Sequence, residues 1–251
     1  MSRGLAALTS REVLRVLKLW TQTIAAPIIS SFLFILVFGL SLSGRISHVD
    51  GIPYKQFVGA GLMSSAVMWA APFETTWNIF FKMEETRLYD SVLSTPVEVQ
   101  DLVVAEVAWA ATRAVIYGTT FTLIVAEFGL VDSPWAILTP LVLALGGACF
   151  GMLGLAFTSL IKTMDWYSFY YTLFITPLFL FSGIFYPLDR LPDWVHVVAW
   201  FTPLYHLVQI TRGLVLGPDA LSVLGNAAWL LAVTAALFVI PARALRRRLV
   251  A

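Results

Sequence analysis

The sequence contains little charge, almost no cysteine and no recognisable catalytic motif. Only 12% of its 251 residues are charged, and its single cysteine, Cys149, cannot form an internal disulfide. It has no G-x-x-x-x-G-K-[ST] loop for nucleotide phosphates, no nucleophile elbow, no zinc-protease helix and no paired-carboxylate arrangement. The histidines His48, His196 and His206 match no familiar metal-site spacing. The chain is therefore predicted to hold no catalytic, metal or nucleotide site, and any energy source must be an ion gradient or another subunit.

Apolar residues, by contrast, are abundant. Hydrophobic types make up 59% of the sequence and the mean hydropathy is +0.83, more than a soluble domain of this length can bury. A membrane-spanning helix needs about 20 apolar residues. Runs of that kind lie at Ile24–Ser43, Phe57–Phe81, Leu102–Phe128, Trp135–Ile161, Trp166–Tyr186 and Leu221–Ile240. Because lipid cannot satisfy backbone groups and no run alternates as a barrel strand would, we predict an all-α integral membrane protein with six transmembrane helices.

Basic residues predict the orientation, because they favour the cytoplasmic side of short loops. With the N-terminus inside, the cytoplasmic set is Arg3, Arg11, Arg15, Lys18, Lys82, Arg87, Lys162, Arg243, Arg246, Arg247 and Arg248. The opposite side holds only Arg45, Lys55, Arg190 and Arg212. Prolines 192, 203 and 218 divide residues 187–220 into pieces too short to span, so we predict an extracytoplasmic re-entrant helical hairpin there. Residues 221–251 then form helix 6 and a basic cytoplasmic tail, and both termini are cytoplasmic.

Residues 1–23 are predicted to form an amphipathic helix in the membrane interface. The basic face carries Arg11, Arg15 and Lys18, and the opposite face is apolar with Val13, Leu14, Leu17 and Trp20. The apolar run that follows is too long for the core of a signal peptide, so we expect this segment to be retained. A short cytosolic extension of the first span is the alternative.

A polar segment at residues 82–101 separates helices 1–2 (24–81) from helices 3–5 (102–186). It includes EETRLYDSVLSTPVEVQ, residues 84–100. Glu84–Leu93 is predicted to be a short helix, and Thr95 as N-cap, Pro96 at the first position and Glu98 in a capping box predict that the third helix begins there. A short helix held between two membrane helices transmits a push to both of them. An ordinary solvated loop is the alternative.

Three charged residues fall inside predicted spans, where each costs a few kcal/mol or more unless it is paired or wetted. They are Glu74, Glu106 and Arg113. Glu106 and Arg113 are seven residues apart on one helix face, and antiparallel packing would let Arg113 meet Glu74 or Glu106. We hypothesise an interior ion-pair cluster that shifts during transport, with a static structural pair as the alternative.

Small residues in the fourth predicted span indicate close helix packing. Gly147 and Gly151 form a G-x-x-x-G pattern, which Gly154 extends. The partner is either another helix of the same subunit or the seam of a dimer.

Two blocks of sequence carry a resemblance to a known family. The first, FETTWNIFFKMEETRLYDSVLSTPVEVQDLVVAEVAWAA within Pro72–Ala111, resembles the connection between the second and third helices of type 2 ABC exporter permeases. The second, Asp165–Gly217, contains the patterns S-G-x-F-x-P and L-P-x-x-x-x-x-x-x-W-x-x-P-L and resembles the fifth helix and outer hairpin of that family. The chain is most similar to the group of NodJ-type and daunorubicin-resistance permeases.

The resemblance implies a single transmembrane domain over residues 1–251 that pairs with a second permease copy, as a homodimer or a heterodimer, and with two copies of an ABC ATPase subunit. ATP and Mg are expected in that ATPase, and nucleic acid is not an expected partner. By resemblance, Glu84–Leu93 is the coupling helix, and residues 82–101 are the cytoplasmic loop that contains it. Its candidate ATPase contacts are Glu84, Glu85, Arg87, Leu88, Tyr89 and Asp90. Phe181, Phe185 and Tyr186 are candidates for lining the substrate exit.

The expected function is export of an amphiphile, such as a lipo-oligosaccharide, a glycolipid or a hydrophobic drug, across the bacterial cytoplasmic membrane. Two other classes remain open. An ion-coupled transporter would show inverted repeats or broken helices with polar groups at the midplane. A membrane-embedded transferase would need catalytic acids or histidines at one interface, where the sequence offers only Asp50, Asp189, Asp193, His196 and His206.

Overall fold

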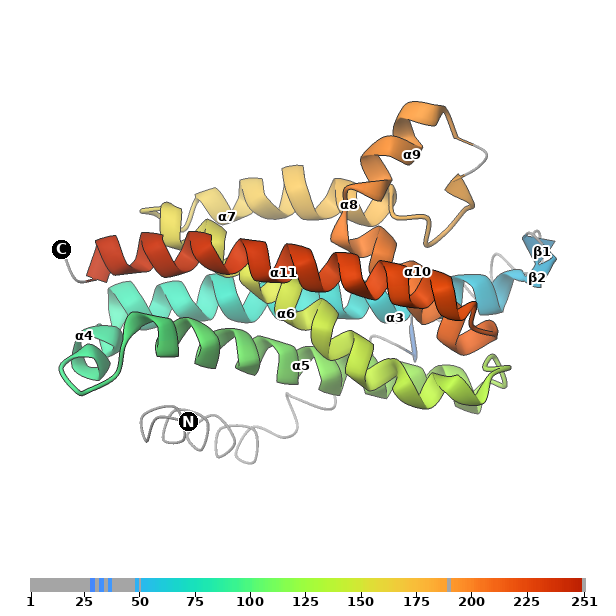
Figure 1. Ribbon diagram of the computed structural model, residues 1–251, viewed down its shortest axis with the longest axis horizontal. Coiled ribbons are helices and arrows are strands. Elements are labelled where there is room, and N and C mark those ends of the chain that lie inside the picture. The colour runs from blue at the N-terminus through green and yellow to red at the C-terminus, as the bar shows by residue number, and fades with distance from the viewer. Residues whose placement is uncertain are drawn as a thin grey trace.

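Long helices lie side by side along the long axis of the molecule in the computed structural model (Figure 1). The structure describes residues 28–29, 32–33, 36–37, 48–49, 51–188 and 191–249. The interfacial helix predicted at 1–23 and most of the first predicted span lie outside these residues. The helices and strands described below therefore begin at residue 48.

The elements follow one another along the chain with short connections. A hairpin of β1 (His48–Val49) and β2 (Ile52–Pro53) precedes α3 (Tyr54–Phe73), η3 (Glu74–Asn78), η4 (Phe81–Glu85), α4 (Leu88–Leu93) and α5 (Val99–Glu127). The second half contains η5 (Pro134–Leu138), α6 (Thr139–Leu160), α7 (Trp166–Phe169), η6 (Tyr170–Ile175), α8 (Thr176–Leu180), α9 (Asp193–Trp200), α10 (Pro203–Leu216) and α11 (Ala220–Leu249). α4 and the C-terminal end of α11 lie at one end of the bundle, and the β-hairpin lies at the other (Figure 1).

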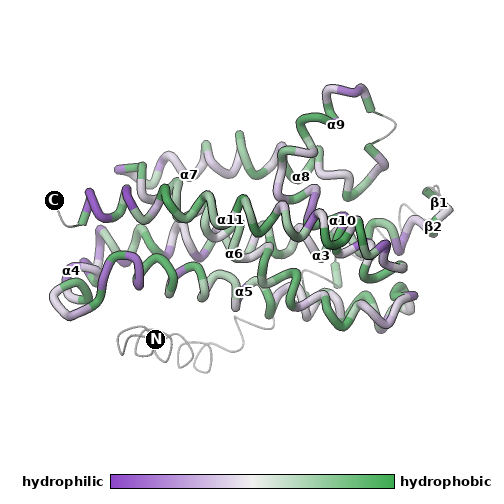
Figure 2. The backbone as a smooth tube through the Cα atoms, in the orientation of Figure 1, coloured by the Kyte–Doolittle hydropathy of each residue, from purple (hydrophilic) through white to green (hydrophobic). Residues whose placement is uncertain are grey.

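Three helices among the described residues are long and apolar enough to cross a membrane, judged by length and composition. They are Val99–Glu127, Pro134–Leu160 and Ala220–Leu249. The second predicted span is a helical run over residues 54–85 that passes through the π-helical turns η3 and η4. Hydrophobic residues occupy the middle of α11, whereas its C-terminal end is hydrophilic (Figure 2).

The fifth predicted span is shorter than expected. It was predicted to extend from Trp166 to Tyr186, but α7, η6 and α8 together end at Leu180. Phe181 leaves helical geometry with ψ 15°, and Gly183 takes a φ of 76°, a left-handed conformation that glycine adopts without steric cost. The chain therefore turns away before the aromatic residues that follow.

The predicted start of the third helix is also wrong by a few residues. α5 begins at Val99 with Glu98 as its N-cap, and Asp101 completes the capping box. The Thr95 hydroxyl instead donates a 2.6 Å hydrogen bond to the Val92 carbonyl, so it closes the end of α4. Thr95 cannot cap α5 while it serves the preceding helix.

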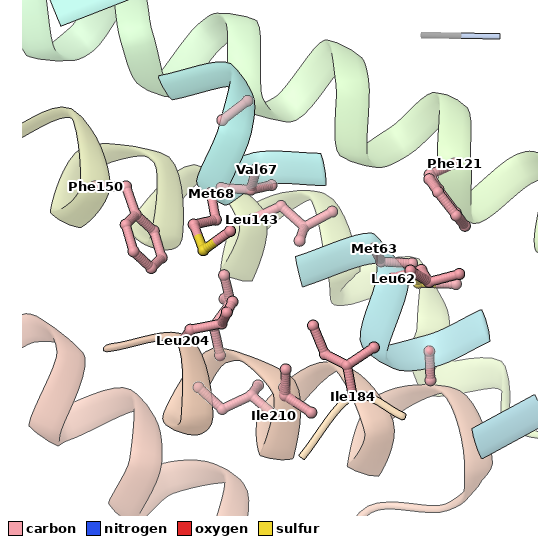
Figure 3. Close-up of a cluster of buried hydrophobic side chains, with 14 of the residues drawn as sticks. Leu62, Met63, Val67, Met68, Phe121, Leu143, Phe150, Ile184, Leu204 and Ile210 are labelled. Carbon is pink, nitrogen blue, oxygen red and sulfur yellow. The ribbon is translucent and has the colours of Figure 1, made fainter. Parts of the chain in front are cut away.

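One large core joins the helices. Its buried side chains come from α3, α5, α6, α10 and the segment after α8, and they converge in the centre of the bundle (Figure 3). The labelled members are Leu62, Met63, Val67, Met68, Phe121, Leu143, Phe150, Ile184, Leu204 and Ile210. Since α10 contributes to this core, the second part of the outer region predicted as a hairpin is packed into the bundle, whereas α9 projects away from the long helices (Figure 1).

The glycines of α6 pack within the chain, as the first of the two interpretations predicted. A Cβ on Gly147 would lie 3.0 Å from the Ala111 Cα of α5, and a Cβ on Gly154 would lie 3.1 Å from the Pro72 Cα of α3. These positions leave no room for a side chain. They allow α6 to approach both α3 and α5 closely.

Candidate functional site

The short helix in the polar segment is smaller than the sequence predicts. It was expected to span Glu84–Leu93, but Glu84 and Glu85 still belong to η4, and α4 covers only Leu88–Leu93. Arg87 separates the two with φ 46° and ψ 34°, a left-handed conformation that breaks the helix. The chain therefore turns sharply at Arg87, and α4 is a separate six-residue helix.

The exposed face of this segment carries most of the residues proposed to contact an ATPase. The side chains of Glu84, Glu85, Arg87 and Asp90 are exposed, and Leu88 is half-buried. Tyr89 is different, because only 1% of its surface is accessible. In this arrangement the Tyr89 ring faces the interior of the bundle, so a direct contact of Tyr89 with a partner stays a prediction that its burial does not favour.

Tyr89 instead joins a buried polar cluster that we call the Glu106 cluster, made of Lys82, Tyr89 and Glu106. The Tyr89 hydroxyl donates a hydrogen bond of 3.0 Å to Glu106 Oε1. Lys82 Nζ lies 2.8 Å from each carboxylate oxygen of Glu106. Lys82 belongs to η4, Tyr89 to α4 and Glu106 to α5. α4 and η4 are thus both bonded to the same carboxylate of α5, that of Glu106.

The Glu106 cluster corrects the predicted charge cluster of Glu74, Glu106 and Arg113. Of the two partners considered for Arg113, the structure selects Glu74, with 3.1 Å between Arg113 Nε and Glu74 Oε1. Glu74 Oε2 also accepts hydrogen bonds from Trp109 Nε1 at 3.0 Å and Asn78 Nδ2 at 2.6 Å. The charges therefore form two separate groups, and Lys82, which the sequence analysis assigned only to the cytoplasmic set, is the partner of Glu106.

A cavity of about 630 Å³ lies beside the Glu74–Arg113 pair. Two stripes of side chains spaced four residues apart face it, one on the α3–η3 run and one on α5. The first stripe is Trp69, Phe73 and Trp77, and the second is Arg113, Tyr117 and Phe121. Tyr171 of η6 closes one side, stacked on Trp69 at 6.1 Å between ring centroids. The cavity thus combines aromatic walls with one cationic group.

The sequence contained a signal for this cavity that was not recognised. Spacings of four residues at 69, 73 and 77 and at 113, 117 and 121 place each triplet on one helix face. The aromatic residues that were proposed to line the exit lie elsewhere. Phe185 packs edge-on against Phe179 at 5.2 Å, the Tyr186 hydroxyl donates to the Leu180 carbonyl, and Phe181 begins the turn after α8.

The last turn of α11 is bound to the same end of the bundle as α4. Arg248 Nη2 lies 2.7 Å from Glu84 Oε1, and Arg248 Nη1 donates to the carbonyls of Thr158, at 3.1 Å, and Ile161. These carbonyls belong to the C-terminal end of α6, where a cation is favoured by the helix dipole. Arg248 therefore holds together the ends of η4, α6 and α11, a role that the sequence analysis did not assign.

The comparisons with known proteins agree with one another. A family model described as ABC-2 type transporter matches residues 3–216. Nodulation protein J of Rhizobium leguminosarum bv. viciae is 34% identical over 236 residues, which cover 92% of this chain and 90% of that protein. Nodulation protein J of Sinorhizobium fredii is 35% identical over 189 residues, or 75% of this chain and 71% of that protein. The inner membrane transport permease YadH of Escherichia coli K12 is 26% identical over 206 residues, or 82% and 80%.

Proposed function

This chain belongs to the ABC-2 type transporter family, whose members are membrane-embedded transport subunits that work with an ABC ATPase, and we propose that it is the permease of an exporter for an amphiphilic substrate. The substrate class is a lipo-oligosaccharide, a glycolipid or a hydrophobic drug. Export runs outward across the bacterial cytoplasmic membrane, a location supported by the similarity to an inner membrane transport permease.

The contact between Tyr89 and Glu106 carries the proposal. A helix with an exposed polar face and a buried tyrosine bonded to α5 is suited to transmit force, because a push on the exposed face displaces groups held inside the bundle. ATP and Mg act in the ATPase subunit, and its contact residues on this chain are Glu84, Glu85, Arg87, Leu88 and Asp90. Two ATPase copies serve two permease copies, which form a homodimer or pair with a related permease.

The proposed topology has six transmembrane helices with both termini in the cytosol. An interfacial amphipathic helix at 1–23 precedes them, and α9 and α10 form an extracytoplasmic re-entrant hairpin between the fifth and sixth. In this arrangement, α4 and the basic end of α11 lie on the cytoplasmic side. The positions of Arg243, Arg246, Arg247 and Arg248 at the same end as α4 support it.

The aromatic cavity supports an amphiphilic substrate. Flat aromatic walls bind apolar chains and the apolar faces of sugar rings, while Arg113 offers a cation to an anionic or hydroxylated group. We propose that the substrate passes through this cavity and that the Glu74–Arg113 pair rearranges as it does so. Phe181, Phe185 and Tyr186 remain candidates for a later, outer part of the route.

An ion-coupled transporter is the principal alternative, and a membrane-embedded transferase is a weaker one. Among the candidate residues for a transferase, His206 uses both ring nitrogens, with Asn226 Oδ1 at 2.6 Å and the Trp200 carbonyl at 2.7 Å, and it stacks on Trp229. Both ring nitrogens of His206 are therefore occupied by structural hydrogen bonds. An adjacent reading frame encoding an ABC ATPase would favour the exporter over both alternatives.

Co-purification with that ATPase tests the function directly. The chain should retain the ATPase in lipid and alter its hydrolysis rate. Arg87→Ala with Asp90→Ala should weaken both effects, because it removes two exposed charged groups, one at the start of α4 and one within it. Lys55→Ala with Glu127→Ala is a matched control, since it also removes one exposed cation and one exposed anion, at the opposite end of the bundle. Failure of the folded wild-type chain to retain the ATPase would contradict the proposal.

A further inference from the structure

A second cavity of about 550 Å³ lies where the connection from α4 to α5 meets the end of α11. We call it the α11 groove. Its apolar wall comes from Leu93, Val97 and Val99, and its basic wall comes from Arg243 and Arg246. Glu98 and Gln100 add one carboxylate and one amide to the lining. The groove is separate from the aromatic cavity and from the Glu106 cluster, which involve other residues.

The two arginines of the groove have no structural partner among the described residues. Both side chains are exposed, and neither has an ion-pair or hydrogen-bond partner among the residues that the structure describes. Arg248, two residues after Arg246, shows the contrast, because its guanidinium is bound to Glu84 and to two carbonyls. Two arginines against the single carboxylate of Glu98 leave the groove with an excess of positive charge, which favours an anionic occupant.

The position of the groove on α11 indicates what kind of anion. Val239, Arg243 and Arg246 are spaced as i, i+4 and i+7, so they lie along one face of the helix. Val239 is 41% exposed, and only 6% of the apolar window of α11 is buried inside the molecule. An apolar surface open to lipid thus leads directly into the basic groove.

We infer that the α11 groove binds the headgroup of an anionic phospholipid from the cytoplasmic leaflet. The phosphate sits between Arg243 and Arg246, and an acyl chain follows the exposed apolar face of α11 past Val239. Basic pockets between membrane helices on the cytoplasmic side have this chemistry. The inference rests on the proposed orientation, with the end of α11 in the cytosol.

A lipid in this position would act next to the ATPase-coupling segment. Leu93 is the last residue of α4, Val97 lies in the connection to α5, and Val99 is the first residue of α5. A lipid headgroup in the groove would therefore contact both the end of α4 and α11. An acidic segment of the ATPase is the competing occupant, but it would not account for the continuity of the groove with the lipid-exposed face of α11.

Native mass spectrometry of the purified full-length chain tests the inference without the ATPase. Phosphatidylglycerol and phosphatidylcholine are titrated onto wild type, onto Arg243→Gln with Arg246→Gln, and onto Lys162→Gln with Arg247→Gln. The second pair is the control, because it also removes two exposed cytoplasmic cations but neither residue lines the groove. Wild type and control should prefer phosphatidylglycerol, and the groove variant should bind it about 30-fold more weakly, as expected for two basic groups.

Equal loss of phosphatidylglycerol binding in both variants would overturn the inference, because it would show a general charge effect. Unchanged lipid binding in a groove variant that no longer retains the ATPase would also overturn it, in favour of the acidic segment. Gel-filtration profiles identify a variant that has failed to fold, and the single substitution Arg246→Lys, which keeps the charge, should then retain most of the binding. Lipid binding and ATPase retention are measured separately. A negative result for the lipid site therefore does not contradict the proposed exporter function, and a negative result for ATPase retention does not contradict the lipid site.

Discussion

At the scale of single residues, each buried charge among the described residues, Glu74, Lys82 and Glu106, has partners around it. Glu106 is 6% exposed and is bound by Lys82 and Tyr89, and Glu74 is 5% exposed and is bound by Arg113, Trp109 and Asn78. A buried ion pair is a weak source of stability, but removal of one partner leaves an uncompensated charge. These residues therefore make the fold sensitive to single substitutions.

Lys82 and Glu106 should behave as a coupled pair. Glu106→Leu should destabilise the chain by about 3–5 kcal/mol, because it strands the Lys82 ammonium in the bundle. Lys82→Met with Glu106→Leu should be less destabilising than the sum of the single substitutions, since no charge is then left unpaired. Thermal unfolding of the four proteins in detergent measures this coupling. Additive losses would mean that the two groups do not interact.

Arg113 should matter for transport more than for folding if the Glu74–Arg113 pair rearranges beside the aromatic cavity. Arg113→Lys retains the positive charge but loses the planar guanidinium, so it should preserve assembly and reduce substrate-stimulated ATPase activity. Arg113→Ala should impair both. The measurement is ATPase activity of the reconstituted complex with and without an amphiphile, next to its gel-filtration profile. Wild-type assembly and transport in Arg113→Ala would contradict the role proposed for this pair.

At the scale of elements, the structure depends on close approach of α6 to its neighbours and on the separation of α4 from η4. α6 reaches α3 and α5 through Gly147, Gly151 and Gly154, where an added Cβ would lie 2.9 Å or less from the nearest side-chain atom, well inside van der Waals contact. α4 is set apart by the left-handed turn at Arg87 and is attached to α5 through the hydrogen bond of Tyr89 to Glu106. The bundle is thus tightly packed in its middle and has a distinct small helix at one end.

Two glycine substitutions should have opposite effects. Gly147→Ala should destabilise the chain by about 1–3 kcal/mol, because the new methyl group meets the Ala111 backbone and the Ala114 side chain. Gly225→Ala in α11 is the matched control. A Cβ there has nothing within 4 Å, so helix propensity should stabilise the chain by up to about 1 kcal/mol. Thermal unfolding midpoints compare the two, and a neutral Gly147→Ala would show that α6 is less tightly packed than described.

Arg87→Gly separates the backbone role of this position from its proposed contact role. Glycine adopts φ 46° without the penalty of about 1–2 kcal/mol that other residues incur, so folding should be unimpaired or improved. Loss of the guanidinium should still weaken ATPase binding. Unfolding and ATPase retention are measured on the same preparation. Full retention would remove Arg87 from the contact surface.

At the scale of the whole molecule, polar residues gather at the ends of an apolar bundle. One end holds α4, the end of α11 and the Arg248 contacts, and the other holds the β-hairpin and the bond from Gln56 Nε2 to Asp132 at 2.9 Å. Such a distribution suits a protein with two aqueous faces and a lipid belt between them. Because the chain belongs to the ABC-2 type transporter family, this bundle is a membrane-embedded transport subunit.

Cysteine labelling should reveal the orientation of the bundle. Cys149 is buried, so Cys149→Ala provides a background with no native thiol to react. Lys55→Cys should react with a membrane-impermeant maleimide in intact spheroplasts, whereas Lys162→Cys and Arg247→Cys should react only after permeabilisation. All three positions are exposed, and the proposed topology puts Lys55 outside and the other two in the cytosol. The reverse pattern would invert the proposed topology and would also remove the groove at Arg243 from the cytoplasmic leaflet.

The sequence by itself determined the properties that depend on composition and periodicity. The long apolar runs specified helices and a membrane protein, the polar segment at 82–101 marked a separate short helix, and the glycines of α6 marked close packing. Local turn chemistry was less predictable, because Thr95 was free to serve either the helix before it or the helix after it. Only its bond to Val92 decided the matter.

Which groups meet across helices was decided by the tertiary structure alone. The sequence allowed Arg113 to pair with either Glu74 or Glu106. In the packed bundle Arg113 pairs with Glu74, and Lys82 pairs with Glu106. Tyr89 looked like an exposed contact residue until the position of α4 against α5 buried it. The physical reason is that hydrophobic periodicity fixes which face of a helix is buried, whereas the choice of partner depends on the rotation and depth of the neighbouring helix.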